Sequence, residues 1–344
     1  FLAGRSLGIW VFVLAATATS FSGWTFVGHP GKIFTDGLPY AFASFYALTI
    51  PFTGVLFLRR QWVLGRAYRY ITPGEMYSDY YGGNSIRMLT VLVAFLFSVP
   101  YLGVQLRASG DLFSVLTDGL VNPNTGMSAL STVVMIYVAS GGLRSVAFVD
   151  CAQAVLLALG IAILGGIVIY YAGGWGGFTA SFAEVVRNDL AFDNNLTSDG
   201  FSSKVALPGS IQFVSSGAQS IGGGWTGIMC MTYMFALMGI QSSPAFSMWA
   251  YSNKTSRAFR WQQVVASSLV IGVILFSFTI IQGIGGHVLI EKGVIENATD
   301  KNLIPQLINL LSDSAPWLVG LLAVCALAAM QSTGAAYMLS LIHI

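Results

Sequence analysis

Charge is scarce in this sequence. Only 9% of the 344 residues are Asp, Glu, Lys or Arg, compared with about 25% in an ordinary soluble domain. The net charge of +2 is too small to indicate a nucleic-acid partner. The three cysteines and three histidines are scattered and give neither a disulfide framework nor metal-ligand spacing. No nucleophile–base pair or phosphate-binding loop is apparent, so we expect neither an enzyme nor a cofactor.

Apolar residues, in contrast, make up 55% of the chain, and the mean hydropathy is +0.72. Apolar runs of about 20 residues recur, and each can cross a hydrocarbon core of about 30 Å. We therefore predict an all-α polytopic protein in a lipid bilayer. Its eight spanning segments are expected at about 6–28, 36–58, 86–117, 126–141, 146–172, 223–250, 263–289 and 315–340.

The few charges are distributed unevenly among the loops. Three loops are mainly basic, and they carry Arg59, Arg60, Arg66, Arg69 and Arg87, then Arg144, then Lys254, Arg257 and Arg260. The loops between them are acidic or neutral. Eight alternating crossings place every basic loop on one side, which the positive-inside rule makes cytoplasmic. This pattern predicts a multi-pass protein of the plasma (inner) membrane.

Two spanning segments are interrupted by small and polar residues. The first breaks near Thr19 to Gly23, and the sixth breaks at Gly239 to Pro244. Such residues are tolerated at membrane depth only where the backbone faces protein or a watery cavity. Breaks in the first and sixth segments indicate two inverted repeats of five helices whose breaks meet near the bilayer midplane. We divide the chain into a first repeat at about 5–172, an external loop at about 173–222 and a partial second repeat at about 223–340.

Four motifs, in order, resemble those of the sodium:solute symporter family, which includes the sodium/proline and sodium/glucose cotransporters. They are Phe1 to Gly8 with Ala15 to Gly31; Thr72-Pro73-Gly74-Glu75 to Gly82; Gly141 to Val146 with Asp150 and Gln153; and Ala328-Ala329-Met330-Gln331-Ser332-Thr333. The resemblance implies a LeuT-type fold over the single transmembrane domain 1–344, with the second repeat incomplete. It also implies that one helix before Phe1 and at least two after Thr333 are absent.

The resemblance also implies a sodium site between the first broken helix and the eighth helix. Its ligands would be the carbonyls of Ala18, Phe21 and Ala329 and the hydroxyls of Ser332 and Thr333. Neutral oxygens suit a hard cation that must be released again. The alternative is that the two hydroxyls bond only to their own helix or to a neighbouring helix.

On the solute side, the resemblance implies contacts from Ser20, Ser22, Gly23 and Trp24. Some relatives have aspartate where Ser20 stands, which argues against an amine-binding role for this position. Gln241, after the second break, resembles a polar position that touches substrate. Packing between helices is the alternative interpretation of each of these residues.

The third segment contains Gln105, Arg107 and Asp111. Arg107 and Asp111 are four residues apart and can pair on one helical face. Either Gln105 or Arg107 faces the transport path, or the ion pair only packs helices. Asp150 follows the cytoplasmic turn, where a helix dipole stabilises a carboxylate, and the resemblance places it on the exit route of sodium.

We therefore expect sodium-coupled symport of a small organic solute by alternating access. Arg107 weakly favours an amino acid or an organic acid. A solute-sensing domain of a signalling protein and a proton-coupled transporter on the same scaffold are the alternatives. The sequence leaves open the identity of the solute, the sodium stoichiometry and the oligomeric state.

Overall fold

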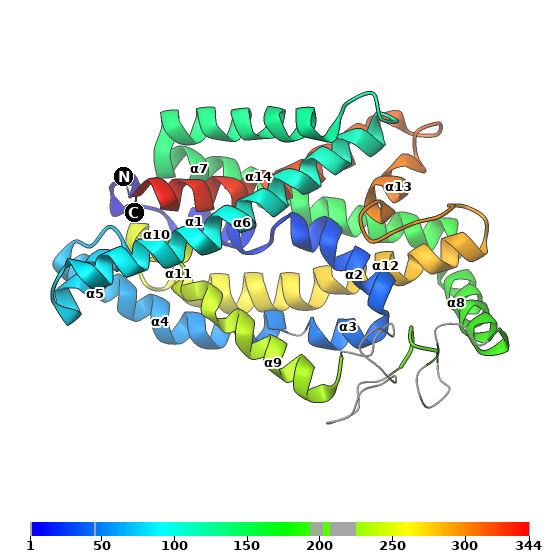
Figure 1. Cartoon of the computed structure of the whole chain (residues 1–344), viewed down its shortest axis with the longest axis horizontal. Helices are drawn as coiled ribbons and strands as arrows, with labels where there is room; N and C mark the ends of the chain where they lie inside the picture. Colours follow the sequence, from blue (N-terminus) through cyan, green and yellow to red (C-terminus); the bar gives the residue numbers. More distant parts are fainter. Residues whose placement is uncertain (1, 45, 193–195, 197–201, 207–224, 344) are drawn as a thin grey trace.

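The computed structural model describes residues 2–44, 46–192, 196, 202–206 and 225–343. Within these residues it contains helices and two isolated β-bridges but no strand. The longer helices run along one common axis (Figure 1). They are α4 (Tyr46–Tyr68), α6 (Asn84–Leu116), α7 (Pro123–Tyr171), η4 with α12 (Trp261–Leu275 and Phe276–Glu291) and α14 (Pro316–His343).

The first span is broken where the sequence predicts. Helix α1 (Ile9–Ser20) ends before Phe21, and the chain resumes as the π-helix η2 (Trp24–Gly28) and then α2 (His29–Asp36). The two halves are bent by 57°. Near the end of α1, the hydroxyls of Thr19 and Ser20 donate hydrogen bonds to carbonyls one turn earlier, which competes with continuation of the helix.

The predicted sixth segment is also interrupted. Helix α9 (Gly227–Met238) leads into the 3-10 helix η3 (Gly239–Ser242), and α10 (Pro244–Ser252) follows. Pro244 lies at the first position of α10, where its missing N–H costs no helical hydrogen bond. Both breaks predicted for the first and sixth segments are therefore confirmed.

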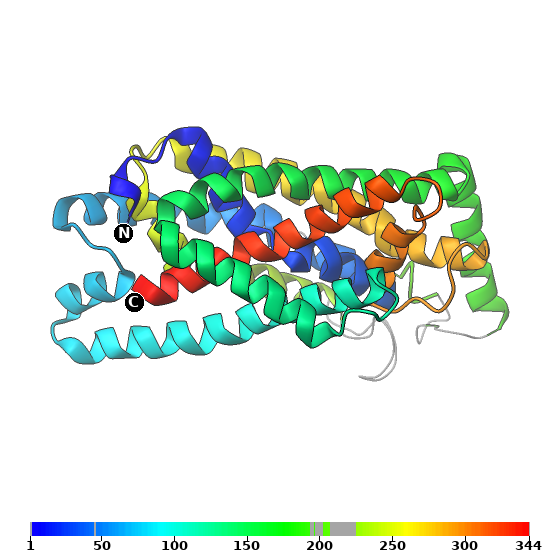
Figure 2. The same ribbon diagram turned by 90° about the horizontal axis from the view of Figure 1, so that it is seen from above.

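Five helices in the described part of the chain are long and apolar enough to span a membrane, or six with the bent first pair counted as one. One of the five, α7, has 49 residues and reverses direction at Gly142, so that its two arms run antiparallel (Figures 1 and 2). Gly142 has φ 56°, which glycine adopts without steric cost. The arms match the predicted segments 126–141 and 146–172, and α9 and α10 lie at the predicted segment 223–250.

The elements that frame the first break are α14, α7 and α6. Helix α14 crosses the middle of the bundle (Figure 2) and packs against α7, α6, α1 and α10. Its buried residues include the run from Ala328 to Tyr337, apart from a half-buried Gln331. This packing brings the predicted Ala329–Thr333 segment to the end of α1.

The second half of the first span is held by close packing and polar contacts. His29 is fully buried, stacks on Phe276 and bonds to Thr279 at 2.8 Å and to Ser44 at 2.6 Å. Helix α8 (Gly174–Ala191) follows α7 in the chain. Its Asp189 forms a buried ion pair with Lys204 at 2.6 Å.

We predict that a single methyl group on α12 weakens the contact between α2 and α12. A Cβ atom at Gly283 would lie 2.5 Å from Ile33 Cβ and 2.6 Å from the Pro30 carbonyl oxygen. Gly283→Ala should therefore lower the free energy of unfolding by about 1–3 kcal/mol, seen as a lower melting temperature in detergent. The matched control is Gly166→Ala, at a helical glycine with open space around its Cβ position. An unchanged melting temperature for Gly283→Ala would show that this contact is not tight.

Candidate functional site

The hydroxyls of α14 meet the carbonyl end of α1. Ser332 Oγ lies 3.3 Å from the Ala18 carbonyl oxygen and 3.2 Å from that of Ala329. Thr333 Oγ1 lies 3.5 Å from the carbonyl oxygens of Thr19 and Ala329. Ser332 and Thr333 are fully buried. Residues more than 300 positions apart in the sequence thus form one cluster of neutral oxygens.

Phe21 marks the end of this cluster. Its N–H donates to the Thr17 carbonyl at 3.1 Å as the C-cap of α1, and its buried ring packs edge-on against Phe276. The structure thus brings Ala18, Ala329, Ser332 and Thr333 into direct contact and places Phe21 directly after the last turn of α1. Each hydroxyl reaches both its own helix and α1, as the alternative interpretation describes, and the sodium assignment stays a prediction.

Sequence reasoning missed Thr19. Its carbonyl accepts from Thr333, and its hydroxyl accepts a 3.0 Å hydrogen bond from Trp249 Nε1 of α10. Thr19 therefore connects the end of α1 to both α14 and the second broken span. The adjacent hydroxyl-rich sequence was the available signal, but the tryptophan partner lies 230 residues away.

The broken segment itself is held by Gln105 of α6. Its Oε1 accepts a 3.0 Å hydrogen bond from the Gly23 N–H, and Trp24 N–H donates to Ser22 Oγ at 3.1 Å. Gln105 is 2% exposed, and its Nε2 has no hydrogen-bond partner among the described residues. The amide thus holds the break through its oxygen and keeps two donor hydrogens unused.

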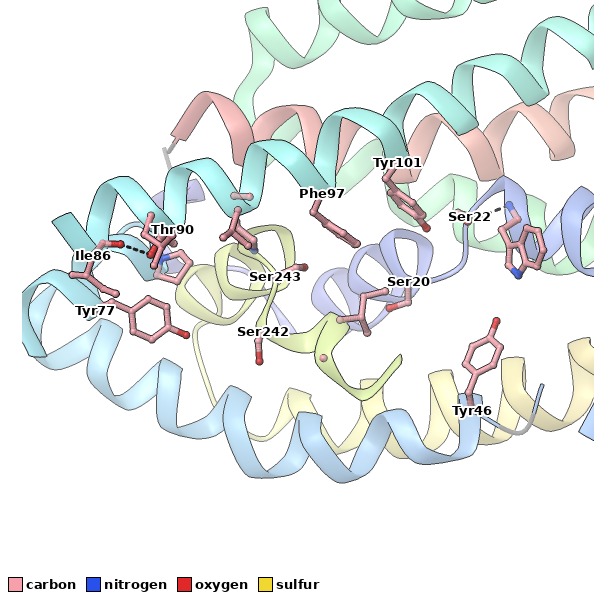
Figure 3. A pocket seen from close by; sticks show the side chains of 18 of the residues that line it. Ser20, Ser22, Tyr46, Tyr77, Ile86, Thr90, Phe97, Tyr101, Ser242 and Ser243 are labelled. Carbon is pink, nitrogen blue, oxygen red and sulfur yellow. Dashed lines mark hydrogen bonds between the residues drawn. The ribbon is translucent and has the colours of Figure 1, made fainter. Parts of the chain in front are cut away.

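A cavity of about 820 Å³ extends from the break toward α5 (Pro73–Tyr81). Ser20, Ser22 and Trp24 line its inner end. In Figure 3, Phe97 and Tyr101 project from α6 and Tyr46 projects from α4, on opposite sides of the space. The predicted motif at Thr72 shapes the far end of the cavity. Thr72 and Glu75 form the capping box that starts α5, and residues of α5 line this end.

A second cavity of about 470 Å³ lies against the other side of the break. Gly23, Trp24 and Gln105 line it, together with Arg107 and Asp111. Arg107 Nε lies 3.1 Å from a carboxylate oxygen of Asp111, and the Arg107 side chain is 62% exposed. The ion pair expected from the sequence is therefore present, and it faces a cavity. Three further charged residues line this cavity, namely Lys32, Asp300 and Lys301.

Asp150 and Gln241 lie apart from these contacts. Asp150 is eight residues beyond Gly142 in the second arm of α7, fully buried, and neither carboxylate oxygen has a hydrogen-bond partner among the described residues. The helix-dipole explanation is wrong, because that effect is confined to the first turn. The backbone of Gln241 belongs to η3, and its side chain lies outside the described part of the structure.

The family model of the sodium:solute symporter family matches residues 1–341. The high-affinity choline transporter 1 of Drosophila melanogaster is 32% identical over 161 residues, 46% of this chain and 25% of the transporter. The sodium/proline symporter of Escherichia coli (strain K12) is 29% identical over 184 residues, 51% of this chain and 35% of the symporter. The chain spans about a quarter to a half of the length of the curated relatives it matches.

A solved structure has the same fold. It is described as the substrate-bound outward-open state of a Na⁺-coupled sialic acid symporter, with a TM-score of 0.77 at 16% identity over the whole of this chain and 67% of that one. The predicted LeuT-type fold is thus confirmed. Since the family and these relatives are transporters, the prediction that the chain is not an enzyme is confirmed as well.

We predict that Gln105→Met, a change of similar volume, loosens the broken segment. It leaves the buried Gly23 N–H without an acceptor, at a cost of about 1–3 kcal/mol. The melting temperature should fall, and hydrogen exchange should quicken in a peptide covering residues 21–25. Ser109→Ala is the control, because Ser109 is also buried on α6 but donates only to a carbonyl of its own helix. Unchanged exchange in Gln105→Met would contradict the role of this bond.

Proposed function

Because the chain belongs to the sodium:solute symporter family, we propose that its protein carries a small organic solute together with sodium across the membrane by alternating access. The observation that carries the proposal is the meeting of the α14 hydroxyls with the carbonyl end of the broken α1. This cluster offers several oxygens, all neutral, which is the ligand chemistry of a hard cation that must also leave.

In this proposal sodium is held by the carbonyls of Ala18, Phe21 and Ala329 and by the hydroxyls of Ser332 and Thr333. The ion replaces hydrogen bonds of 3.2–3.5 Å, which lie at or beyond the long end of the normal range. It takes the oxygen lone pairs and links α1 to α14 by coordination. Sodium binding therefore fixes the end of α1 and, through it, the shape of the break. Asp150 then lies along the path by which the ion is released.

The solute is proposed to bind at the break itself. Ser20, Ser22 and Trp24 line the larger cavity, and Gly23, Trp24 and Gln105 line the smaller one. Gln241 from the second break is the sixth proposed contact. Arg107 and the free donor hydrogens of Gln105 suit a carboxylate, which favours an amino acid or a small organic acid.

Alternating access is supported by the two cavities on either side of the break, which share Trp24. A change in the backbone conformation of the break would open the solute site to one cavity and close it to the other. One sodium charge moving through ~100 mV releases ~2.3 kcal/mol, which supports roughly 50-fold accumulation of solute.

The arrangement in the membrane follows from the charges of the loops. We propose one transporter domain over 1–344, with repeats at about 5–172 and 223–340 and the external loop at about 173–222. The protein is a multi-pass membrane protein, and we place it in the plasma (inner) membrane with the basic loops in the cytoplasm.

We predict that Ser332→Ala and Thr333→Ala each raise the sodium concentration for half-maximal uptake by about tenfold or more, since a lost ligand worth ~1.4 kcal/mol changes affinity tenfold. The double variant should lose sodium-dependent uptake. The assay uses the full-length protein in vesicles, with potassium replacing sodium at fixed pH. Thr333→Ser should retain activity. Ser340→Ala is the matched control, because Ser340 is buried on α14 and bonds only within that helix. If the double variant still shows sodium-dependent uptake, the assignment of Ser332 and Thr333 as sodium ligands is wrong.

We predict the sidedness of two loops from their charge. With the native cysteines replaced, a cysteine at Glu296 should react with a membrane-impermeant maleimide in intact cells. A cysteine at Arg257 should react only after permeabilisation. Both positions are exposed. The reverse pattern would show that the basic loops face outward.

A further inference from the structure

The larger cavity has an unusual lining for a site that takes a charged solute. Its described lining contains no Asp, Glu, Lys, Arg or His. A carboxylate that entered it would lose water without gaining a cationic partner, which is costly in a low-dielectric site. Arg107, the group that favours a carboxylate, lies on the smaller cavity instead.

Aromatic rings take the place of charges in this lining. One third of the lining residues are aromatic, and they come from five separate parts of the chain: Trp24, Tyr46, Tyr77, Tyr81, Phe97, Tyr101 and Tyr233. Tyr46 and Tyr233 meet edge to face, with ring centroids 5.8 Å apart and planes at 75°. Phe97 and Tyr101 lie nearly parallel on α6, 5.9 Å apart.

The rings surround the space next to the break. Tyr46 reaches in from α4 on one side and Phe97 and Tyr101 from α6 on the other, with Ser20 at the end of α1 between them (Figure 3). Tyr101 is further supported by Tyr337 of α14, whose ring centroid lies 4.9 Å away. Ring faces attract a diffuse cation through their quadrupole, and several faces together recognise alkylated ammonium groups. A neutral apolar group of the same shape gains only the burial of its surface.

We propose that the larger cavity binds the solute through an N-alkylated ammonium group, held by the faces of Tyr46, Tyr101 and Trp24. This inference rests on the proposed transport function and narrows the solute class. The carboxylate preference assigned to Arg107 and Gln105 then applies to the other end of the solute, on the smaller cavity. A solute that carries both groups would touch both sides of the break.

The test compares choline with 3,3-dimethylbutan-1-ol, which has the same shape but no charge. The affinity of the full-length protein for each compound is measured in sodium buffer, from the rise in melting temperature as the compound is titrated and from competition between the two compounds. Cation–π binding predicts that choline binds about tenfold more tightly or better, since ~1.4 kcal/mol corresponds to tenfold. Glycine betaine, which adds a carboxylate, should bind at least as tightly as choline. Equal binding of choline and its neutral analogue would overturn the proposal, as would stronger binding of propionate than of choline.

Variants of the rings make the test specific. Tyr46→Leu and Tyr101→Leu should each weaken choline binding about tenfold and leave the neutral analogue within twofold. Tyr46→Phe and Tyr101→Phe keep the ring and should keep choline binding. Tyr80→Leu is the control, because Tyr80 is 81% exposed and does not line the cavity. Equal loss of both ligands in the leucine variants would contradict a cation–π role.

The two proposals can fail separately. If sodium raises the melting temperature and the double variant with Ser332→Ala and Thr333→Ala loses that shift, the ion site stands whatever the solute experiments give. If sodium has no effect in any assay, the transport proposal fails. Tighter binding of choline than of its neutral analogue would then still support the aromatic site as a binding site.

Discussion

The structure depends on how the backbone of the first span is satisfied where its helix stops. Unpaired backbone groups at membrane depth cost several kcal/mol each. Here the carbonyls of Ala18 and Thr19 are approached by hydroxyls of α14, and the Gly23 N–H is paired with Gln105 of α6. The break is therefore tied to two other spans, and the hydroxyl of Thr19 adds a third tie, to Trp249. Loss of any one of these partners would therefore remove a hydrogen bond that holds the break.

The two sides of the break differ in chemistry. The larger cavity is uncharged in its described lining and rich in aromatic rings, whereas the smaller one is lined by five charged residues. Among the described lining residues, only Trp24 lines both cavities. A charged group in the smaller cavity stays partly hydrated and paired, and a group that enters the larger one must exchange water for ring faces. This division offers a physical basis for selecting a solute by both of its ends.

The sequence was sufficient for features that depend on local composition. Proline, glycine and hydroxyl side chains within apolar runs mark both breaks, and the apolar runs themselves mark the spans. The pairing of Ser332 and Thr333 with α1 came from resemblance rather than from composition. The partners of Gly23 and Thr19, 82 and 230 residues distant, depend on how whole helices pack and have no local signal. The burial of Asp150, two turns into the second arm of α7, was missed for the same reason, because residue spacing predicts a helix but not how deeply its residues are buried.

The geometry at α1 and α14 also bears on the strength of ion binding. Four of the five oxygens proposed as ligands, those of Ala18, Ala329, Ser332 and Thr333, already take part in hydrogen bonds of 3.2–3.5 Å. A bound ion therefore gains only the difference between coordination and these weak bonds. A carboxylate ligand would add a strong attraction that would have to be overcome when the ion is released. With neutral ligands, a driving force of ~2.3 kcal/mol per charge at 100 mV is comparable to the energies that hold the site. Neutral ligands that already bond to one another therefore limit the gain from ion binding, which would keep the proposed site reversible.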